Sequence, residues 1–152
     1  MSSRQAPTRR ESLFTLLAFT AAAVAALLIG DLPYYGSDTI IYETWTYTPS
    51  FPNPSDMMLL TRHLSIAAWL AAAFLAWRAG AGLIFWWLFL LGQSVWLWFI
   101  FETSFPLTIA LSALLAVLAL VAIIRFWAVS RLAALLALPA LAWAITSGIW
   151  TT

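Results

Sequence analysis

Apolar residues along this chain fall into five long stretches that are separated by polar segments. The stretches hold 18 to 21 residues each and cover residues 13–30, 57–77, 83–101, 107–124 and 132–149. A helix that crosses the apolar part of a bilayer needs about 20 such residues. The pattern therefore predicts an all-α integral membrane protein, a bundle of five transmembrane helices that forms a single membrane domain over residues 1–152.

The first stretch follows a polar, arginine-rich start, which is also typical of a signal peptide. It holds 18 residues, whereas the apolar part of a signal peptide has about 7–15. The residues that close it, Ile29-Gly30-Asp31, are not a small-residue cleavage site. We expect an uncleaved membrane anchor, and a cleaved signal peptide is the alternative.

One long polar connection, residues 31–56, joins the first two stretches. It holds four prolines, four acids and six aromatic residues. Proline at this density disfavours a continuous helix, and disordered segments are poor in aromatic residues. We predict a loop that folds over the outer mouth of the bundle and buries its aromatic rings there.

Composition excludes several classes of function. The chain is 64% hydrophobic and 9% charged, whereas soluble domains carry about 25% charged residues. A net charge of +1 gives no case for a nucleic-acid partner. With no cysteine and one histidine, thiolate sites and multi-histidine metal sites are excluded. No catalytic constellation stands out, so an enzyme is the less expected class.

Arginines are distributed unevenly between the two sides of the predicted bundle. If five helices alternate in direction, six of the seven arginines fall on one side and five of the six acids on the other. Cytoplasmic segments of membrane proteins are enriched in basic residues. We therefore predict a cytoplasmic N-terminus, with the long loop and the C-terminus outside.

Two ionisable residues, Arg62 and His63, lie inside the second apolar stretch. A charge inside a membrane span is costly and normally faces the bundle interior or a wet cavity. In a structural interpretation, Arg62 reaches the outer interface or pairs with Asp56 or Glu102. In a functional one, it binds the carboxylate of a ligand. His63 alone could serve as a base or as one axial ligand, and its presence proves neither role.

Polar and aromatic residues at similar depths form the candidate site. Gln93 and Trp96 are three apart and share a face of the third helix. A glutamine within the membrane needs a hydrogen-bond partner, so helix–helix contact is an equal alternative to ligand contact. The predicted ligand-binding residues are Trp45, Phe51, Arg62, His63, Gln93, Trp96 and Trp143. We predict no catalytic residue and no metal ligand.

Residues 89–101 read FLLGQSVWLWFIF. They resemble the third-helix pattern Q-L-x-L-N-x-x-W-S-x-x-F-F of the TspO/MBR family (tryptophan-rich sensory protein, translocator protein). Gln93 stands at the Asn of that pattern, and Trp96 and Phe101 match it. Phe89 replaces its Gln.

Two further segments resemble the same family. Residues 133–143 resemble its fifth-helix pattern A-x-x-L-x-x-P-Y-x-x-W, with matches at Pro139 and Trp143 and with Ala140 in place of the Tyr. Residues 48–54, TPSFPNP, resemble the segment K-P-S-W-x-P-P that precedes its second helix. Five spans, a long first loop and richness in tryptophan agree with the family over the whole chain.

The resemblance implies a five-helix bundle, often a homodimer, that binds porphyrins and other hydrophobic ligands under the first loop. Where the family has a Trp-Thr pair early in helix two, this chain has Arg62-His63, so those ligand contacts are not reproduced. We expect a multi-pass protein of a prokaryotic cell membrane that binds a hydrophobic anionic ligand, porphyrin-like or tetrapyrrole-like, in transport or sensing. It would require no cofactor, and its partners would be lipid, ligand and a second copy.

Two other functions stay open. A small accessory subunit of a larger membrane complex would pack its tryptophan and alanine faces on partner helices, and it would purify with stoichiometric partners. A membrane enzyme or transporter would use Arg62, His63 and Glu102.

The arginine distribution generates a topology prediction. Reporter tags at the N-terminus and beside Gly80 should report the cytoplasm, and tags beside Ser37 and after Thr152 should report the outside. Accessibility labelling of intact cells measures this. A cytoplasmic C-terminus would rule out five alternating spans.

Overall fold

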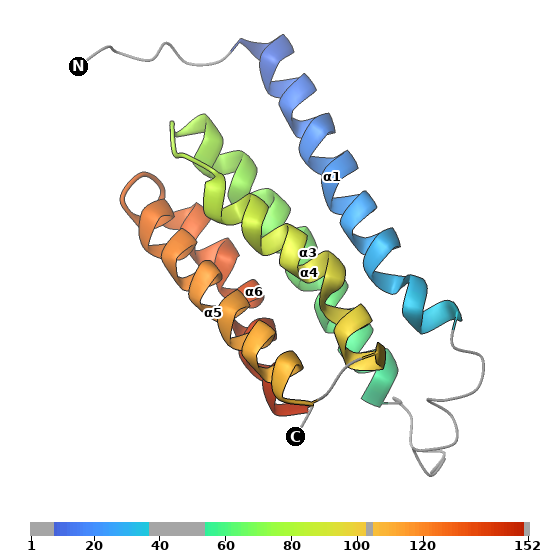
Figure 1. Cartoon of the computed structure of the whole chain (residues 1–152). Coiled ribbons are helices and arrows are strands. Elements are labelled where there is room, and N and C mark those ends of the chain that lie inside the picture. The colour runs from blue at the N-terminus through green and yellow to red at the C-terminus, as the bar shows by residue number, and fades with distance from the viewer. Residues whose placement is uncertain (1–7, 37–53, 103–104, 151–152) are drawn as a thin grey trace.

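The structure, a computed structural model, describes residues 8–36, 54–102 and 105–150, and within these ranges every element is an α-helix. The helices are α1 (Arg9–Gly36), α3 (Pro54–Arg78), α4 (Ile84–Glu102), α5 (Phe105–Trp127) and α6 (Arg131–Trp150). Successive helices run in opposite directions, so α1 begins at one end of the bundle and α6 ends at the other (Figure 1).

Four of these helices, α1, α3, α5 and α6, contain stretches long and apolar enough to cross a membrane. α4 also contains an apolar stretch, Ile84–Trp96, among the residues whose side chains the structure describes. The outer surface is apolar as well: Leu28, Leu91 and Ile124, on three different helices, are 66%, 63% and 62% exposed. Such a surface suits lipid rather than water. The prediction of an all-helical protein with several helices able to cross a membrane is confirmed.

The helices form a ring in the order α1, α3, α6, α5, α4 and back to α1. Although α3 and α4 follow one another through a short turn at Gly80 (φ +86°), they lie across the ring and their backbones barely touch. Two indoles bridge them. Trp86 Nε1 donates to the carbonyl of Trp69 at 2.9 Å, and Trp69 Nε1 donates to the carbonyl of Trp86 at 3.4 Å.

Alanine lines the faces where α6 packs against α3 and α5. Without bulky side chains the helix backbones can approach closely, and dispersion contacts between them replace the missing hydrophobic drive inside lipid. The buried alanines are Ala72, Ala73 and Ala76 of α3, Ala119 and Ala122 of α5, and Ala133, Ala134, Ala137, Ala140 and Ala144 of α6.

The prediction that a loop begins at Asp31 is wrong, because α1 continues to Gly36. Pro33 lacks the N–H that would bond the carbonyl of Ile29 within the helix. The indole Nε1 of Trp98 on α4 donates to that carbonyl instead, at 2.9 Å. The lost helical bond is therefore replaced from outside, and the helix tolerates the proline.

The predicted loop also ends earlier than expected, because α3 begins at Pro54. Proline is favoured in the first turn of a helix, where its missing N–H would have no helical partner anyway. The predicted lid therefore reduces to residues 37–53, which lie outside the described residues.

The alanine faces generate a stability prediction. Ala137→Leu on α6 should lower the free energy of unfolding by about 1–3 kcal/mol, because the added atoms have no room in a filled interface. Ala142→Leu, on the exposed side of the same helix, should change it by less than about 0.5 kcal/mol. Unfolding in detergent measures both. Equal losses would mean that the alanine face is not tightly packed.

Candidate functional site

Three helices bring ionisable and polar side chains together around Arg62 of α3, which is 0% exposed. Its Nη1 donates to Oδ1 of Asp31 on α1, forming an ion pair. Its Nε donates to Oε1 of Gln93 on α4 at 3.3 Å, and its Nη2 donates to the backbone carbonyl of Gln93, also at 3.3 Å. These groups, with His63, are called the charge network below.

Gly30 provides the space for the guanidinium group. A Cβ atom at this position would overlap Nη2 of Arg62 and would lie 3.1 Å from both its Cζ and the carbonyl oxygen of Ser94. The backbone of α1 can therefore pass directly over Arg62 only because residue 30 has no side chain. This close approach places Asp31, the next residue, beside the guanidinium.

His63 is the least buried member of the charge network. Its Nε2 lies 2.7 Å from Oδ2 of Asp31, so the two oxygens of this carboxylate serve Arg62 and His63 separately. Because Asp31 is the anion that balances Arg62, a neutral His63 carries its proton on Nε2 and leaves Nδ1 as an acceptor. The side chain of His63 is 37% exposed, against 10% for Asp31.

Charge balance explains why the network is stable inside a membrane protein. A buried charge without a partner is strongly destabilising, whereas a hydrogen-bonded pair of opposite charges is tolerated. Arg62 and Asp31 cancel, and with His63 neutral the network has no net charge. Arg62 pairs with Asp31; the side chains of Asp56 and Glu102, its two predicted partners, lie outside the described residues, so that pairing stays a prediction.

Gln93 has one polar atom that the charge network leaves unused. Its Oε1 accepts from Arg62, which identifies the other amide atom as Nε2. This Nε2 is buried and has no hydrogen-bond partner among the described residues. Buried donors are nearly always satisfied in native proteins, so a water molecule or a ligand acceptor is expected here.

One turn further along α4, Trp96 belongs to a second cluster. Its Nε1 donates to Oγ of Ser112 on α5 at 2.8 Å, and its ring lies edge-on to Trp143 of α6, with 4.8 Å between centroids. Oγ of Ser147 on α6 donates to Oγ of Ser112 at 3.4 Å. This arrangement, the Trp96–Trp143 cluster, is buried.

The structure thus brings together five of the seven predicted site residues in two adjacent groups. Arg62, His63 and Gln93 belong to the charge network, and Trp96 and Trp143 form the neighbouring cluster. The other two, Trp45 and Phe51, lie outside the described residues. Sequence reasoning missed Asp31, although an acid directly after a long apolar stretch is a signal for a partner of an intramembrane arginine.

The opposite half of the bundle has a different interior. There the indoles of Trp69 and Trp86 each donate a hydrogen bond to the backbone carbonyl of the other residue. The Trp69 ring packs against the rings of Phe89 and Phe126, with 4.6 Å and 6.2 Å between centroids. These four rings form an aromatic plug. The buried polar side chains of the described residues all lie on the other side of it: Asp31, Arg62, Ser65, Gln93, Ser94, Thr108, Ser112 and Ser147.

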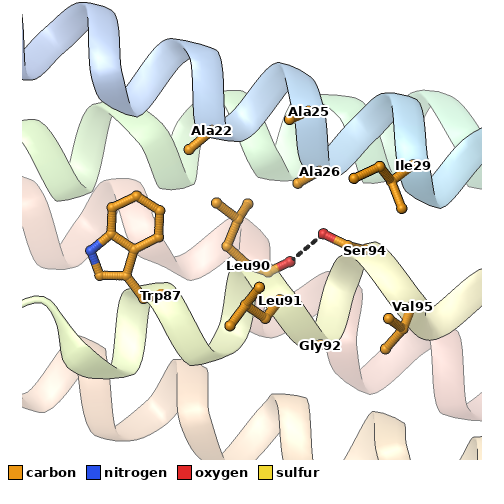
Figure 2. A pocket seen from close by; sticks show the side chains of 10 residues that line it. All are labelled: Ala22, Ala25, Ala26, Ile29, Trp87, Leu90, Leu91, Gly92, Ser94 and Val95. Atoms are coloured by element: carbon orange, nitrogen blue, oxygen red, sulfur yellow. Dashed lines mark hydrogen bonds between the residues drawn. The ribbon is translucent and has the colours of Figure 1, made fainter.

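A separate pocket of about 500 Å³ lies between α1 and α4, outside the ring interior. Figure 2 shows Ala22, Ala25 and Ala26 of α1 facing the side chains of α4 across it. Its wall is almost entirely apolar, and the hydroxyl of Ser94 is already bound to the carbonyl of Leu90 at 2.9 Å. None of the five predicted site residues that the structure describes lines this pocket.

Within the described residues, no group of three His, Cys, Asp or Glu side chains could hold a metal ion. The available chemistry is therefore that of one imidazole, one balanced ion pair and hydrogen-bond donors. No family model, curated protein or solved structure matches this chain.

The charge network generates a prediction about coupled stability. Asp31→Asn should lower the free energy of unfolding by about 3–5 kcal/mol, because it leaves the charge of Arg62 buried and unpaired. Arg62→Gln should lower it by less, because Asp31 keeps Nε2 of His63 as a partner. The double variant should lose less than the sum by at least about 1 kcal/mol, since neither charge remains.

The matched control is Arg131→Gln, which removes an exposed charge at the other end of the bundle and should cost less than about 0.5 kcal/mol. Equilibrium unfolding in detergent gives all four values. Additive losses for the two single variants would show that Asp31 and Arg62 do not depend on each other.

Proposed function

We propose that this protein is a TspO-like membrane protein that binds a hydrophobic anionic ligand, porphyrin-like or tetrapyrrole-like, in transport or sensing. The observation that carries the proposal is a charge network placed beside a cluster of tryptophans inside an otherwise apolar bundle. Ionisable residues inside membrane spans mark functional sites by default. Binding sites for small molecules combine aromatic walls with a few polar groups, as these two groups do.

The division of the interior favours binding over conduction. Water or ions crossing the bundle would need polar groups along its whole length. The buried polar side chains of the described residues stop at the aromatic plug. An interior with polar groups at one end and packed rings at the other suits a receptor, or a carrier that must change shape to release its ligand.

In the functional interpretation of the sequence, Arg62 binds the ligand's carboxylate, and we propose a different residue for this contact. The guanidinium is fully buried and already balanced by Asp31, so it offers no unpaired charge. His63 is more exposed and lies against the same carboxylate. We therefore assign the first contact with a ligand carboxylate to His63, and to Arg62 the role of holding Asp31 in place.

The proposal includes five spans in a prokaryotic cell membrane, with α4 as a full crossing and the N-terminus in the cytoplasm. Two observations support the five alternating spans. The helices alternate in direction, and α4 has 19 residues, enough for about 28 Å of helix. With this orientation the charge network lies near the outer face.

A homodimer, implied by the resemblance, would need an outward face. Ala133, Ala134 and Ala137 of α6 are buried inside the bundle and do not offer one. Ala110 and Ala113 of α5 are exposed and could still pack on a second copy. The same exposed residues would serve the accessory-subunit alternative, for which stoichiometric partners after gentle purification are the distinguishing result.

The proposed function is tested with protoporphyrin IX and its uncharged dimethyl ester. Both should bind the purified protein saturably, measured by the shift of the porphyrin absorption band. Trp143→Ala should weaken both ligands by about 1 kcal/mol, because it removes an aromatic contact and no charge. The acid should bind more tightly than the ester in the wild type.

Trp127→Ala is the control, since Trp127 is exposed at the opposite end of the bundle and should leave both affinities unchanged. Absorption and mass spectra of the natively purified protein identify any ligand that is already bound. No saturable shift with either porphyrin, or equal losses in the two tryptophan variants, would contradict the proposal.

A further inference from the structure

The charge network has no charge left for an anion while His63 is neutral. Arg62 and Asp31 cancel each other, and Nδ1 of a His63 whose proton sits on Nε2 is an acceptor that repels a carboxylate. A carboxylate entering this partly buried place would be an uncompensated charge, which is costly away from water. The network as built therefore disfavours the ligand class proposed above.

Protonation of His63 makes the network favourable for a carboxylate. Protonated His63 keeps Nε2–H on Asp31 and gains a donor at Nδ1, and the network then carries one positive charge. Its ring is the part of the network that is most open to contact, at 37% exposure against 0% for the side chain of Arg62. We infer that the site takes up a ligand carboxylate together with a proton carried by His63. This inference rests on the proposed function.

The surroundings of His63 suit this role. From α1, Asp31 lies with its Oδ2 2.7 Å from Nε2 of the imidazole; from α3, the adjacent Arg62 is paired with the same carboxylate. From α4, Gln93 supplies a neutral donor, Nε2, that is unused in the network. Histidine is also the side chain that most readily changes its charge near neutral pH.

The inference predicts the sign of the pH effect. Binding of an anionic ligand draws a proton from water onto His63, so affinity falls as the pH rises and His63 loses that proton. By linkage, the ligand and the proton favour each other's binding by the same factor. An uncharged ligand gains nothing from the imidazolium, so its affinity should stay constant over the same pH range.

The experiment uses the full chain in nanodiscs of zwitterionic lipid, which removes anionic lipid as a competing source of the same charge. Protoporphyrin IX should bind about tenfold more weakly at about pH 8.5 than at about pH 6. The dimethyl ester should show no such change. Calorimetry of the wild type in two buffers of different ionisation enthalpy should report net proton uptake with the acid and none with the ester.

His63→Gln is the decisive variant, because glutamine keeps an N–H donor for Asp31 but cannot become a cation. It should bind the acid equally at both pH values, with the weaker affinity. Arg131→Gln should behave as the wild type. Binding of the acid that does not vary with pH, or that varies equally in His63→Gln, overturns this inference and leaves the proposed function standing. Failure of both porphyrins to bind at any pH overturns both.

Discussion

The ion pair between Asp31 and Arg62 determines where α1 lies on the rest of the bundle. Within the described residues α1 packs mainly on α3 and α4, and much of its contact surface is apolar and could slide. The Asp31–Arg62 ion pair cannot slide in this way, because no water is available inside a bilayer to solvate either charge if the two separate. Gln93 ties the same guanidinium to α4, so one side chain sets the register of three helices.

The division of the interior follows from the side chains that each half of the ring can accommodate. In one half, alanine faces bring α3, α5 and α6 together, and the distance between α3 and α4 is filled by Trp69 and Trp86. In the other half, the same space holds Arg62, Gln93 and the Trp96–Trp143 cluster. A bundle of this kind has a polar interior at one end and a closed apolar one at the other, without any change in helix arrangement.

The helices were predictable from the sequence because the bilayer imposes length and apolarity on each of them separately. Arg62 was predictable for the same reason, since a charge within a span is conspicuous. Asp31 was not predicted, because an acid at the end of an apolar stretch is also what a helix boundary looks like. Its recruitment depends on contacts between α1 and two other helices.

The order of the helices around the ring and the tolerance of Pro33 were not predictable for a related reason. A short turn normally makes two helices neighbours, and the separation of α3 from α4 reflects the size of two indoles that meet only after folding. A proline normally ends a helix. Pro33 does not, because Trp98, 65 residues later in the chain, donates a hydrogen bond to the carbonyl that the proline leaves without a helical partner.

Gly30 and Arg62 restrict the order in which mutations can accumulate. While Arg62 is present, any side chain at position 30 collides with its guanidinium, so glycine is required there. If residue 62 first became short and uncharged, the collision with the guanidinium would disappear, and alanine at position 30 would need only a small shift away from the carbonyl oxygen of Ser94. Return of an arginine would then be blocked by the new side chain. The two positions thus form an epistatic pair in which an early loss of the arginine becomes difficult to reverse.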